Sequence, residues 1–130
     1  MLAYENGVEA MAWLARAFGF TETMRMLDGA RLAQGSMDTG DGEVMMSSPT
    51  PHYEGPRRHA QSCAAARRWL EVPYIVDGVL VEVDDVDSHY ARAVAAGATI
   101  LSPLEEGGPG HRYRVEDCEG HRWMFLQRQR

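Results

Sequence analysis

The sequence predicts an α+β fold made of two tandem β-α-β-β-β modules. Two observations support this prediction. Each half of the chain reads as one strand, one helix and three further strands, and the two halves match at an offset of 78 residues without a gap. The length of 130 residues and the hydrophobic content of 45% are enough for one core, so we expect a single domain over residues 1–130.

The first module is predicted at residues 1–48. A short strand begins at Leu2. Asn6 stands three residues before Glu9, which is the spacing of a capping box and predicts the start of a helix, and Gly19 supplies its left-handed stop. Turn residues then separate three strand-like runs, predicted at about 22–27, 30–37 and 43–48.

The second module is predicted at residues 78–130 with the same order of elements. Its strands and helix are predicted at 78–83, 86–96, 98–102, 111–116 and 122–127. Adding 78 to a residue number pairs the helix caps Asn6 and Asp84, the helix stops Gly19 and Gly97, and the strand residues Met46 and Met124. Backbone geometry constrains residue choice at caps and stops, so we interpret the match as a true repeat.

An insert at residues 49–77 separates the modules. It is rich in proline at first and then favours a helix from Arg57 to Glu71, which Pro73 stops. The apolar stripe of this helix is modest and several arginines lie beside it, which is typical of a solvated linker. Long inserts in compact domains are often binding elements, so a lid or a dimer arm over a binding cleft is the alternative.

The composition limits the partners that the chain can have. Its net charge of −6 argues against nucleic acid and against an anionic membrane surface. No apolar run is long enough to span a membrane and the N-terminus does not resemble a signal peptide, so we expect a soluble, cytoplasmic protein. Cys63 and Cys118 are far apart in the sequence and are expected to be free thiols.

Two segments carry the strongest family character. One is Trp13-Leu-Ala-Arg-Ala-Phe-Gly-Phe20, and the other is Glu116-Asp-Cys-Glu-Gly-His-Arg-Trp-Met-Phe125 within the last hairpin, Gly110 to Gln127. With the tandem modules, they resemble the vicinal oxygen chelate superfamily of glyoxalase I, bleomycin-resistance proteins and extradiol dioxygenases, in particular its uncharacterised glyoxalase-like bacterial members. The resemblance implies a curved mixed sheet around a cleft, helices on its outer face, and a cleft commonly completed across a homodimer.

The resemblance also allows a test for the metal site of the superfamily. In the metal-dependent members, four side chains, usually His and Glu, come from the first and fourth strands of each module. Alignment places these positions at Met124, at Met46 through the repeat, at Gly78, and before Met1. Thioether sulfur is a poor ligand for Ni, Zn, Fe or Mn, and glycine has no side chain to offer. We therefore expect no metal and no other cofactor.

A metal site elsewhere would have to use other residues, and the histidines are the first candidates. None of their spacings is of the HxH or HxxxH type; they are His52, His59, His89, His111 and His121. His111 and His121 flank the last hairpin with carboxylates between them. They are either an acid–base pair or structural residues around a solvated turn, and we favour the second interpretation.

Strand alternation predicts which side chains face the cleft. Counting from Gly78 and Met124 places Leu80, Glu82 and Arg122 there, whereas counting from Met46 adds Val44 and Ser48. The predicted ligand-binding residues are Tyr4, Met46, Leu80, Glu82, Arg122 and Met124. This mixture of aliphatic, methionine and sparse polar side chains suits an amphipathic organic ligand.

Glu82 is also a candidate catalytic residue, because it is a carboxylate within an otherwise apolar strand. It is either a general base or cation partner, or one half of a salt bridge to an arginine such as Arg112 or Arg122.

We therefore expect a metal-free homodimer that binds a small organic molecule in an apolar cleft. The alternative is a lyase, isomerase or dioxygenase of the same superfamily that uses a relocated metal or Glu82 as its base.

Overall fold

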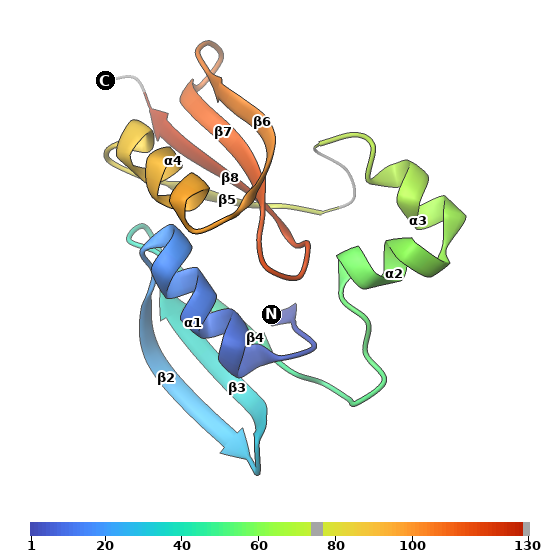
Figure 1. Ribbon diagram of the computed structural model, residues 1–130. Coiled ribbons are helices and arrows are strands. Elements are labelled where there is room, and N and C mark those ends of the chain that lie inside the picture. Colours follow the sequence, from blue (N-terminus) through green and yellow to red (C-terminus); the bar gives the residue numbers. More distant parts are fainter. Residues whose placement is uncertain (74–76, 129–130) are drawn as a thin grey trace.

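The computed structural model describes residues 1–73 and 77–128, in which two four-stranded sheets are connected by helices (Figure 1). Residues 74–76 of the predicted insert and residues 129–130 of the predicted second module lie outside the described residues. The first module contains β1 (Leu2–Ala3), α1 (Gly7–Phe18), β2 (Thr21–Asp28), β3 (Arg31–Asp38) and β4 (Glu43–Ser47). The second contains β5 (Val79–Glu82), α4 (Val86–Ala95), β6 (Thr99–Glu105), β7 (Gly110–Glu116) and β8 (Arg122–Arg128).

Each sheet is mixed in the same way. The strand orders are β1-β4-β3-β2 and β5-β8-β7-β6. β1 runs parallel to β4 and β5 runs parallel to β8, while the other pairs are antiparallel. The prediction of an α+β fold with two β-α-β-β-β modules is therefore confirmed. The described strands form two separate sheets, one in each module, rather than one continuous sheet.

The predicted caps explain where the helices begin and end. The Asn6 side chain accepts a hydrogen bond from the Glu9 backbone N–H at 3.2 Å, and Gly19 ends α1 with φ of 74°. In the second module Gly97 has the matching φ of 84°. The cap of α4, however, is Asp85 and not Asp84, because Asp85 accepts from the Ser88 backbone N–H at 3.1 Å.

The displaced cap shows that the offset between the modules is not constant. Met46 lies opposite Gly35, and Phe125 lies opposite Tyr113, so Met46 corresponds to Phe125 at an offset of 79. One residue is missing between cap and stop in the second module, and one is added in its last turn. Four residues separate Asp38 from its partner Glu43, whereas five separate Glu116 from Arg122. The missing residue and the added residue compensate for each other, so the sequence alone does not reveal the change from an offset of 79 to 78 and back.

A shift of one residue moves a side chain to the other face of a sheet. A Cβ atom on Gly35 would lie 2.7 Å from the Met11 sulfur of α1, so Gly35 and its partner Met46 face this helix. Phe125 likewise packs on rings of α1 and α4, with Phe18 at 4.7 Å and His89 at 4.0 Å between centroids. We call this the helix face of each sheet and the opposite side its open face. Met124, next to Phe125, lies on the open face.

The core lies between the helix faces and the two long helices, α1 and α4, which lie left of centre in Figure 1 with α4 above α1. Aromatic rings from both modules meet there, so one core spans the modules; they are Phe18, Phe20, His89, Tyr113, Trp123 and Phe125.

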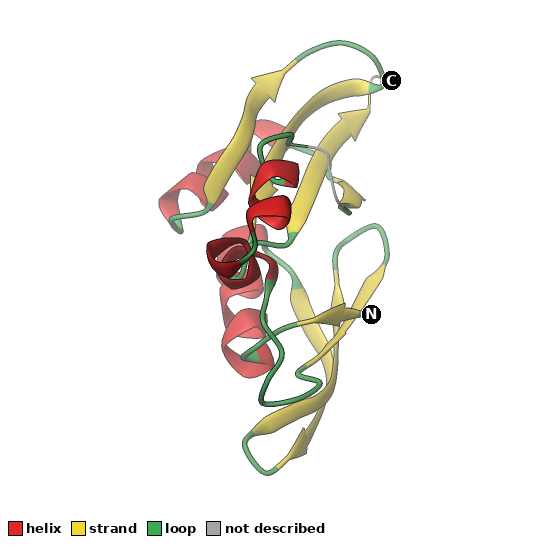
Figure 2. Cartoon of the chain, turned by 90° about the vertical axis from the view of Figure 1, so that its right-hand side faces the viewer, coloured by secondary structure: helices red, strands yellow, loops and turns green. Residues whose placement is uncertain are grey.

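The insert forms two short helices, α2 (Pro56–Ser62) and α3 (Ala64–Trp69), rather than the single helix predicted from Arg57 to Glu71. The chain is extended at Cys63, with φ of −131° and ψ of 109°. The Ser62 hydroxyl donates to the His59 carbonyl at 3.3 Å, a local bond that competes with helix continuation. In Figure 2 both helices face the viewer at mid-height, between the two sheets.

Among the helices of the described residues, none is both long and apolar enough to cross a membrane.

Candidate functional site

A hollow of about 220 Å³ lies on the open face of the second module, where β5 and β8 run side by side. Leu80 and Met124 supply its apolar surface, and Arg114 and Arg122 supply guanidinium groups. Leu80 is 47% exposed, a high value for a leucine in a strand. The other residues that line this hollow are Pro73, Asp77, Gly78, Val79 and Trp123.

A second hollow, of about 350 Å³, adjoins the first beneath the insert. The two hollows share four lining residues, namely Asp77, Gly78, Val79 and Arg122. Tyr53 and Trp69 of the insert provide aromatic walls, and Trp69 is 54% exposed. The other lining residues are Leu2, Glu54, Pro56, His59, Ala66, Leu70, Gly120 and His121. Because α2 and α3 form one wall, the insert belongs to the site.

The insert is held in place by the last turn of the second module. Arg57 donates to the carbonyl oxygens of Asp117 at 2.8 Å and Cys118 at 2.9 Å, and forms an ion pair with Glu116 at 3.0 Å. Gly120 allows this approach, since its φ is 96° and an added Cβ would lie 2.8 Å from the Arg57 backbone nitrogen. The Arg57 to Gly120 contact thus fixes α2 beside the hollow.

Arg122 stands between the two hollows. Its guanidinium donates to the carbonyl oxygens of Leu70 and Val72 at the end of the insert, and lies 3.9 Å from Glu116. Burial lowers the pKa of Arg122, and the nearby Glu116 carboxylate acts in the opposite direction. An arginine stays charged in proteins, so Arg122 places a positive charge at this junction.

Two of the six predicted ligand-binding residues, Met46 and Tyr4, lie elsewhere. Met46 is fully buried on the helix face, and Val44 and Ser48 share that face; the Ser48 hydroxyl accepts from the Gly7 backbone N–H of α1 at 2.8 Å. Tyr4 is also fully buried and donates its hydroxyl to Asp117 at 2.6 Å. Burial, followed by the charge of Asp117, raises the pKa of Tyr4 well above its usual value. The expected placement of these residues on the cleft side is wrong, because it rested on the offset of 78.

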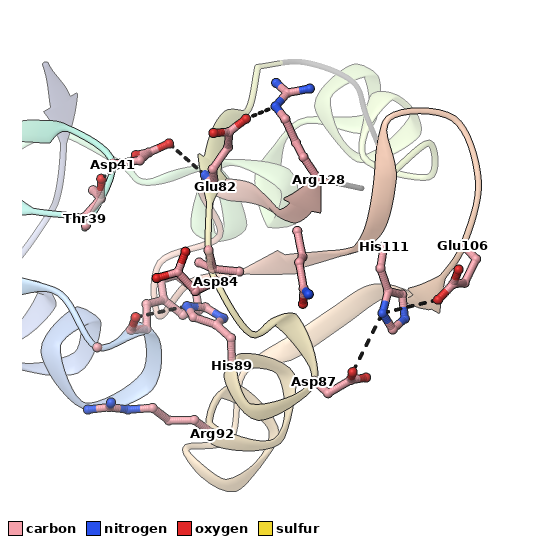
Figure 3. A pocket seen from close by; sticks show the side chains of 15 residues that line it. Thr39, Asp41, Glu82, Asp84, Asp87, His89, Arg92, Glu106, His111 and Arg128 are labelled. Atoms are coloured by element: carbon pink, nitrogen blue, oxygen red, sulfur yellow. Dashed lines mark hydrogen bonds and ion pairs between the residues drawn. The ribbon is translucent and has the colours of Figure 1, made fainter. Parts of the chain in front are cut away.

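The other four predicted residues, Leu80, Glu82, Arg122 and Met124, share the open face of the second module. Glu82 is the last residue of β5, and a third hollow of about 1280 Å³ opens there between the modules (Figure 3). Its carboxylate forms an ion pair with Arg128, and its backbone N–H donates to Asp41 of the first module at 2.8 Å. Of the interpretations of Glu82, the structure therefore shows the salt bridge, with Arg128 in place of Arg112 or Arg122.

The histidines also occupy distinct places. His89 has both ring nitrogens bonded: Nε2 donates to the Phe18 carbonyl at 3.0 Å, so Nδ1 accepts from the Tyr113 hydroxyl at 2.6 Å. Burial lowers the pKa of His89 to about 4, which keeps the ring neutral. His111 faces Asp87 and Glu106 in the third hollow, whereas His121 donates to the Ala3 carbonyl at the opposite end of the β7–β8 hairpin. They do not form an acid–base pair.

The fourth-strand positions that hold metal in the superfamily can now be matched by structure. Met124 corresponds to Met45 rather than to Met46, and both are methionines, so the substitution of thioether for a hard ligand holds in both modules. Within the described parts of the chain, no three His, Cys, Asp or Glu side chains form a group that could hold a metal ion.

The cysteines are both free thiols. Cys118 is half-buried rather than exposed as its place in a turn suggests. Burial raises the pKa of Cys118 to about 12, with Asp117 and Glu119 adding to the effect, so it is a weak nucleophile.

Several residues that shape the site escaped the sequence analysis. Tyr53 and Trp69 lie in the insert, and Arg114 lies on β7 opposite Met124. An aromatic residue within an arginine-rich, weakly amphipathic helix was the available signal for Trp69, since tryptophan is seldom left exposed without a role.

Similarity to known proteins assigns the chain to a superfamily. The family model of the Glyoxalase/Bleomycin resistance protein/Dioxygenase superfamily matches residues 1–125. The chain belongs to this superfamily. No functionally curated protein is similar enough in sequence to match.

Solved structures agree with this assignment. TioX from Micromonospora sp. ML1 is 34% identical, with a TM-score of 0.72 over 99% of this chain and 93% of that chain. A superfamily enzyme from Burkholderia phytofirmans PsJN is 19% identical, with a TM-score of 0.65 over 98% and 94%. The bleomycin-binding protein of Streptomyces verticillus, solved with copper(II)-bleomycin, is 16% identical, with a TM-score of 0.62 over 98% and 92%. The last two show the shared fold alone.

Proposed function

We propose that the chain is a metal-free homodimeric protein that binds a small organic molecule on the open face of the second module and beneath the insert. Sequestering or sensing such a molecule would be its role. The two adjoining hollows are the observation that carries this proposal. They combine an apolar surface from Leu80, Met124 and Trp69 with several polar side chains, a combination that is usual in a ligand pocket.

The absence of metal from the proposal rests on donor chemistry. Met45 and Met124 stand at the fourth-strand positions, and neutral, soft thioethers are poor partners for the ions that this superfamily employs. Stoichiometric divalent metal in the purified protein, with loss of ligand binding on chelation, would overturn this part.

The homodimer is supported by the open face of the first module. Met24, Met26 and Met45 lie there, and Met26 is 56% exposed. Flexible methionine side chains suit adaptable apolar contacts, and exposed apolar patches mark interaction sites. A second chain that brings this face against the open face of the second module would enclose the ligand between them.

An enzyme that uses Glu82 as its base has less support, because the Glu82 carboxylate is ion-paired with Arg128. Turnover of a hemithioacetal or catechol that is lost on Glu82→Gln would favour the enzyme instead.

A fluorescence titration with N-phenyl-1-naphthylamine, a neutral aromatic probe, tests the binding site. Leu80→Asp places a charge on the apolar part of the smaller hollow and is expected to weaken probe binding at least about tenfold. Val94→Asp is the matched control, because Leu80 and Val94 are both 47% exposed but Val94 lies on α4 and lines neither hollow. Equal affinity in the two variants, or no binding by the native protein, would contradict the proposed site.

A further inference from the structure

Within residues 77–128, four arginines lie on the open face of the second module. Arg112 and Arg114 on β7 lie opposite Leu126 and Met124, and Arg122 and Arg128 on β8 share that face by alternation. The chain as a whole has a net charge of −6, so a row of guanidinium groups on one sheet face contrasts with the rest of the molecule.

Glu82 pairs with Arg128, whereas two other carboxylates near this row are each shared between two arginines. Glu105 lies 3.6 Å from Arg112 and 3.4 Å from Arg114. Glu116 lies 3.0 Å from Arg57 and 3.9 Å from Arg122. Each of these two carboxylates therefore serves two guanidinium groups, and two of the arginines, Arg114 and Arg122, line the smaller hollow. Asp77 is the carboxylate among the lining residues of that hollow.

The surroundings strengthen this charge. Arg114 and Arg122 are 25% and 5% exposed in their side chains, and they border Leu80 and Met124. A charge next to apolar surface interacts more strongly with an opposite charge than it would in water. Guanidinium groups are also suited to the planar or tetrahedral oxygens of a carboxylate, sulfonate or phosphate.

We propose that the ligand of this site is an amphipathic organic anion, whose acidic group lies beside Arg114 and Arg122 while its apolar body covers Leu80 and Met124. This inference rests on the proposed function and adds the charge of the ligand. Arg114 is the specificity-determining residue, because it lines the hollow with a partly exposed side chain, whereas Arg122 also holds the end of the insert.

Two related probes separate charge from apolar contact. One is 8-anilino-1-naphthalenesulfonate, and the other is N-phenyl-1-naphthylamine, which has the same two ring systems without the sulfonate. We expect the native protein to bind the sulfonate at least about tenfold more tightly, in line with a charge-assisted hydrogen bond. Added salt should weaken sulfonate binding and leave the neutral probe unchanged.

Variants of Arg114 then test whether this residue causes the tighter binding of the sulfonate. Arg114→Gln should reduce the affinity for the sulfonate about tenfold with little change for the neutral probe, and Arg114→Lys should restore most of the loss because it keeps the charge. Arg25→Gln is the matched control: Arg25 is a partly exposed strand arginine with a carboxylate partner, but it lies opposite Gly35 on the helix face of the other module.

Circular dichroism confirms that each variant is folded, and if Arg114→Gln unfolds, Arg114→Lys and the salt series decide. Equal affinity for the two probes, insensitive to salt and to Arg114, would overturn the inference and leave the proposed function standing. Failure of both probes to bind would overturn the proposed function as well.

Discussion

Asp117 joins the two modules through a single buried carboxylate. It is 1% exposed and accepts four hydrogen bonds. One oxygen accepts from the Tyr4 hydroxyl at 2.6 Å and the Trp123 indole at 3.0 Å, and the other from the backbone N–H groups of Glu119 and His121 at 3.0 Å each. Since Tyr4 belongs to the first module, the carboxylate fixes the N-terminal segment against the last turn.

Asp117→Asn is expected to destabilise the protein by about 2–4 kcal/mol, because an amide nitrogen would then face donors that need an acceptor. Urea denaturation followed by circular dichroism measures the change. Asp28→Asn is the control, since the Asp28 side chain is 75% exposed, and it should cost less than about 0.5 kcal/mol. Similar losses in the two variants would show that the four bonds to Asp117 add little.

His89 makes stability depend on pH in a defined window. Burial lowers the pKa of His89 from 6.5 to about 4 in the folded protein. Between these values the unfolded chain takes up a proton that the folded chain does not, so stability is present above pH 6.5 and is lost as the pH falls toward 4. The ring is partly exposed, so we expect a contribution of about 1–2 kcal/mol.

His89→Gln should flatten this part of the profile, since glutamine can bond to Phe18 and Tyr113 without titrating near neutral pH. Urea midpoints measured from pH 7 to pH 4 check the expectation. His52→Gln, at an exposed position of the insert, should keep the native slope. A native slope in His89→Gln would assign the pH dependence to other groups.

At the scale of elements, the insert packs against the last turn of the second module and is not a free linker. Arg57→Ala removes the bonds that attach α2 to Asp117, Cys118 and Glu116. Because the Arg57 side chain is 43% exposed, we expect the global stability to fall by less than about 1 kcal/mol, while protease cleavage within residues 56–69 increases several-fold. Timed digestion with mass spectrometry measures this. Arg67→Ala, at an exposed position of α3, is the control and should digest as the native chain does.

The elements also show how far the sequence could be interpreted. The strands, the long helices and their caps follow local patterns and were predicted to within a few residues, as for α1 between Asn6 and Gly19. The faces of the strands were harder, because side-chain direction reverses with each residue. The constant offset of 78 residues is correct at Gly97 but one residue too small at Asp85 and Phe125. For this reason Met46 and Tyr4 were predicted to face the cleft. The pairing of β4 with β3, which the sequence does not reveal, was needed to correct it.

The insert shows a different limit. Its helix-favouring composition was recognised, but the break at Cys63 and the docking against Gly120 depend on contacts with the second module. Local propensity cannot encode such a contact, so the hollow beneath Trp69 could not be predicted.

At the scale of the whole molecule, the proposed homodimer would use the open face of the first module to complete the site. Met26 and Leu27 are neighbours on β2 with similar exposure, 56% and 48%, but they point to opposite faces. Met26 lies opposite Gln34 on the open face, and Leu27 lies opposite the buried Leu32 on the helix face. A homodimer that uses the open face would bury Met26 and leave Leu27 as it is.

Met26→Glu is therefore expected to weaken dimerisation at least about tenfold, because it loses the burial of a methionine side chain and adds a charge to the interface. Light scattering over a dilution series measures the mass, with the native protein at twice the mass of one chain. Leu27→Glu adds the same charge to the same strand and should dimerise normally. A monomeric native protein, or equal effects of the two variants, would mean that the ligand site is completed in another way. Loss of binding to N-phenyl-1-naphthylamine in Met26→Glu, in step with loss of the dimer, would show that the two faces act together.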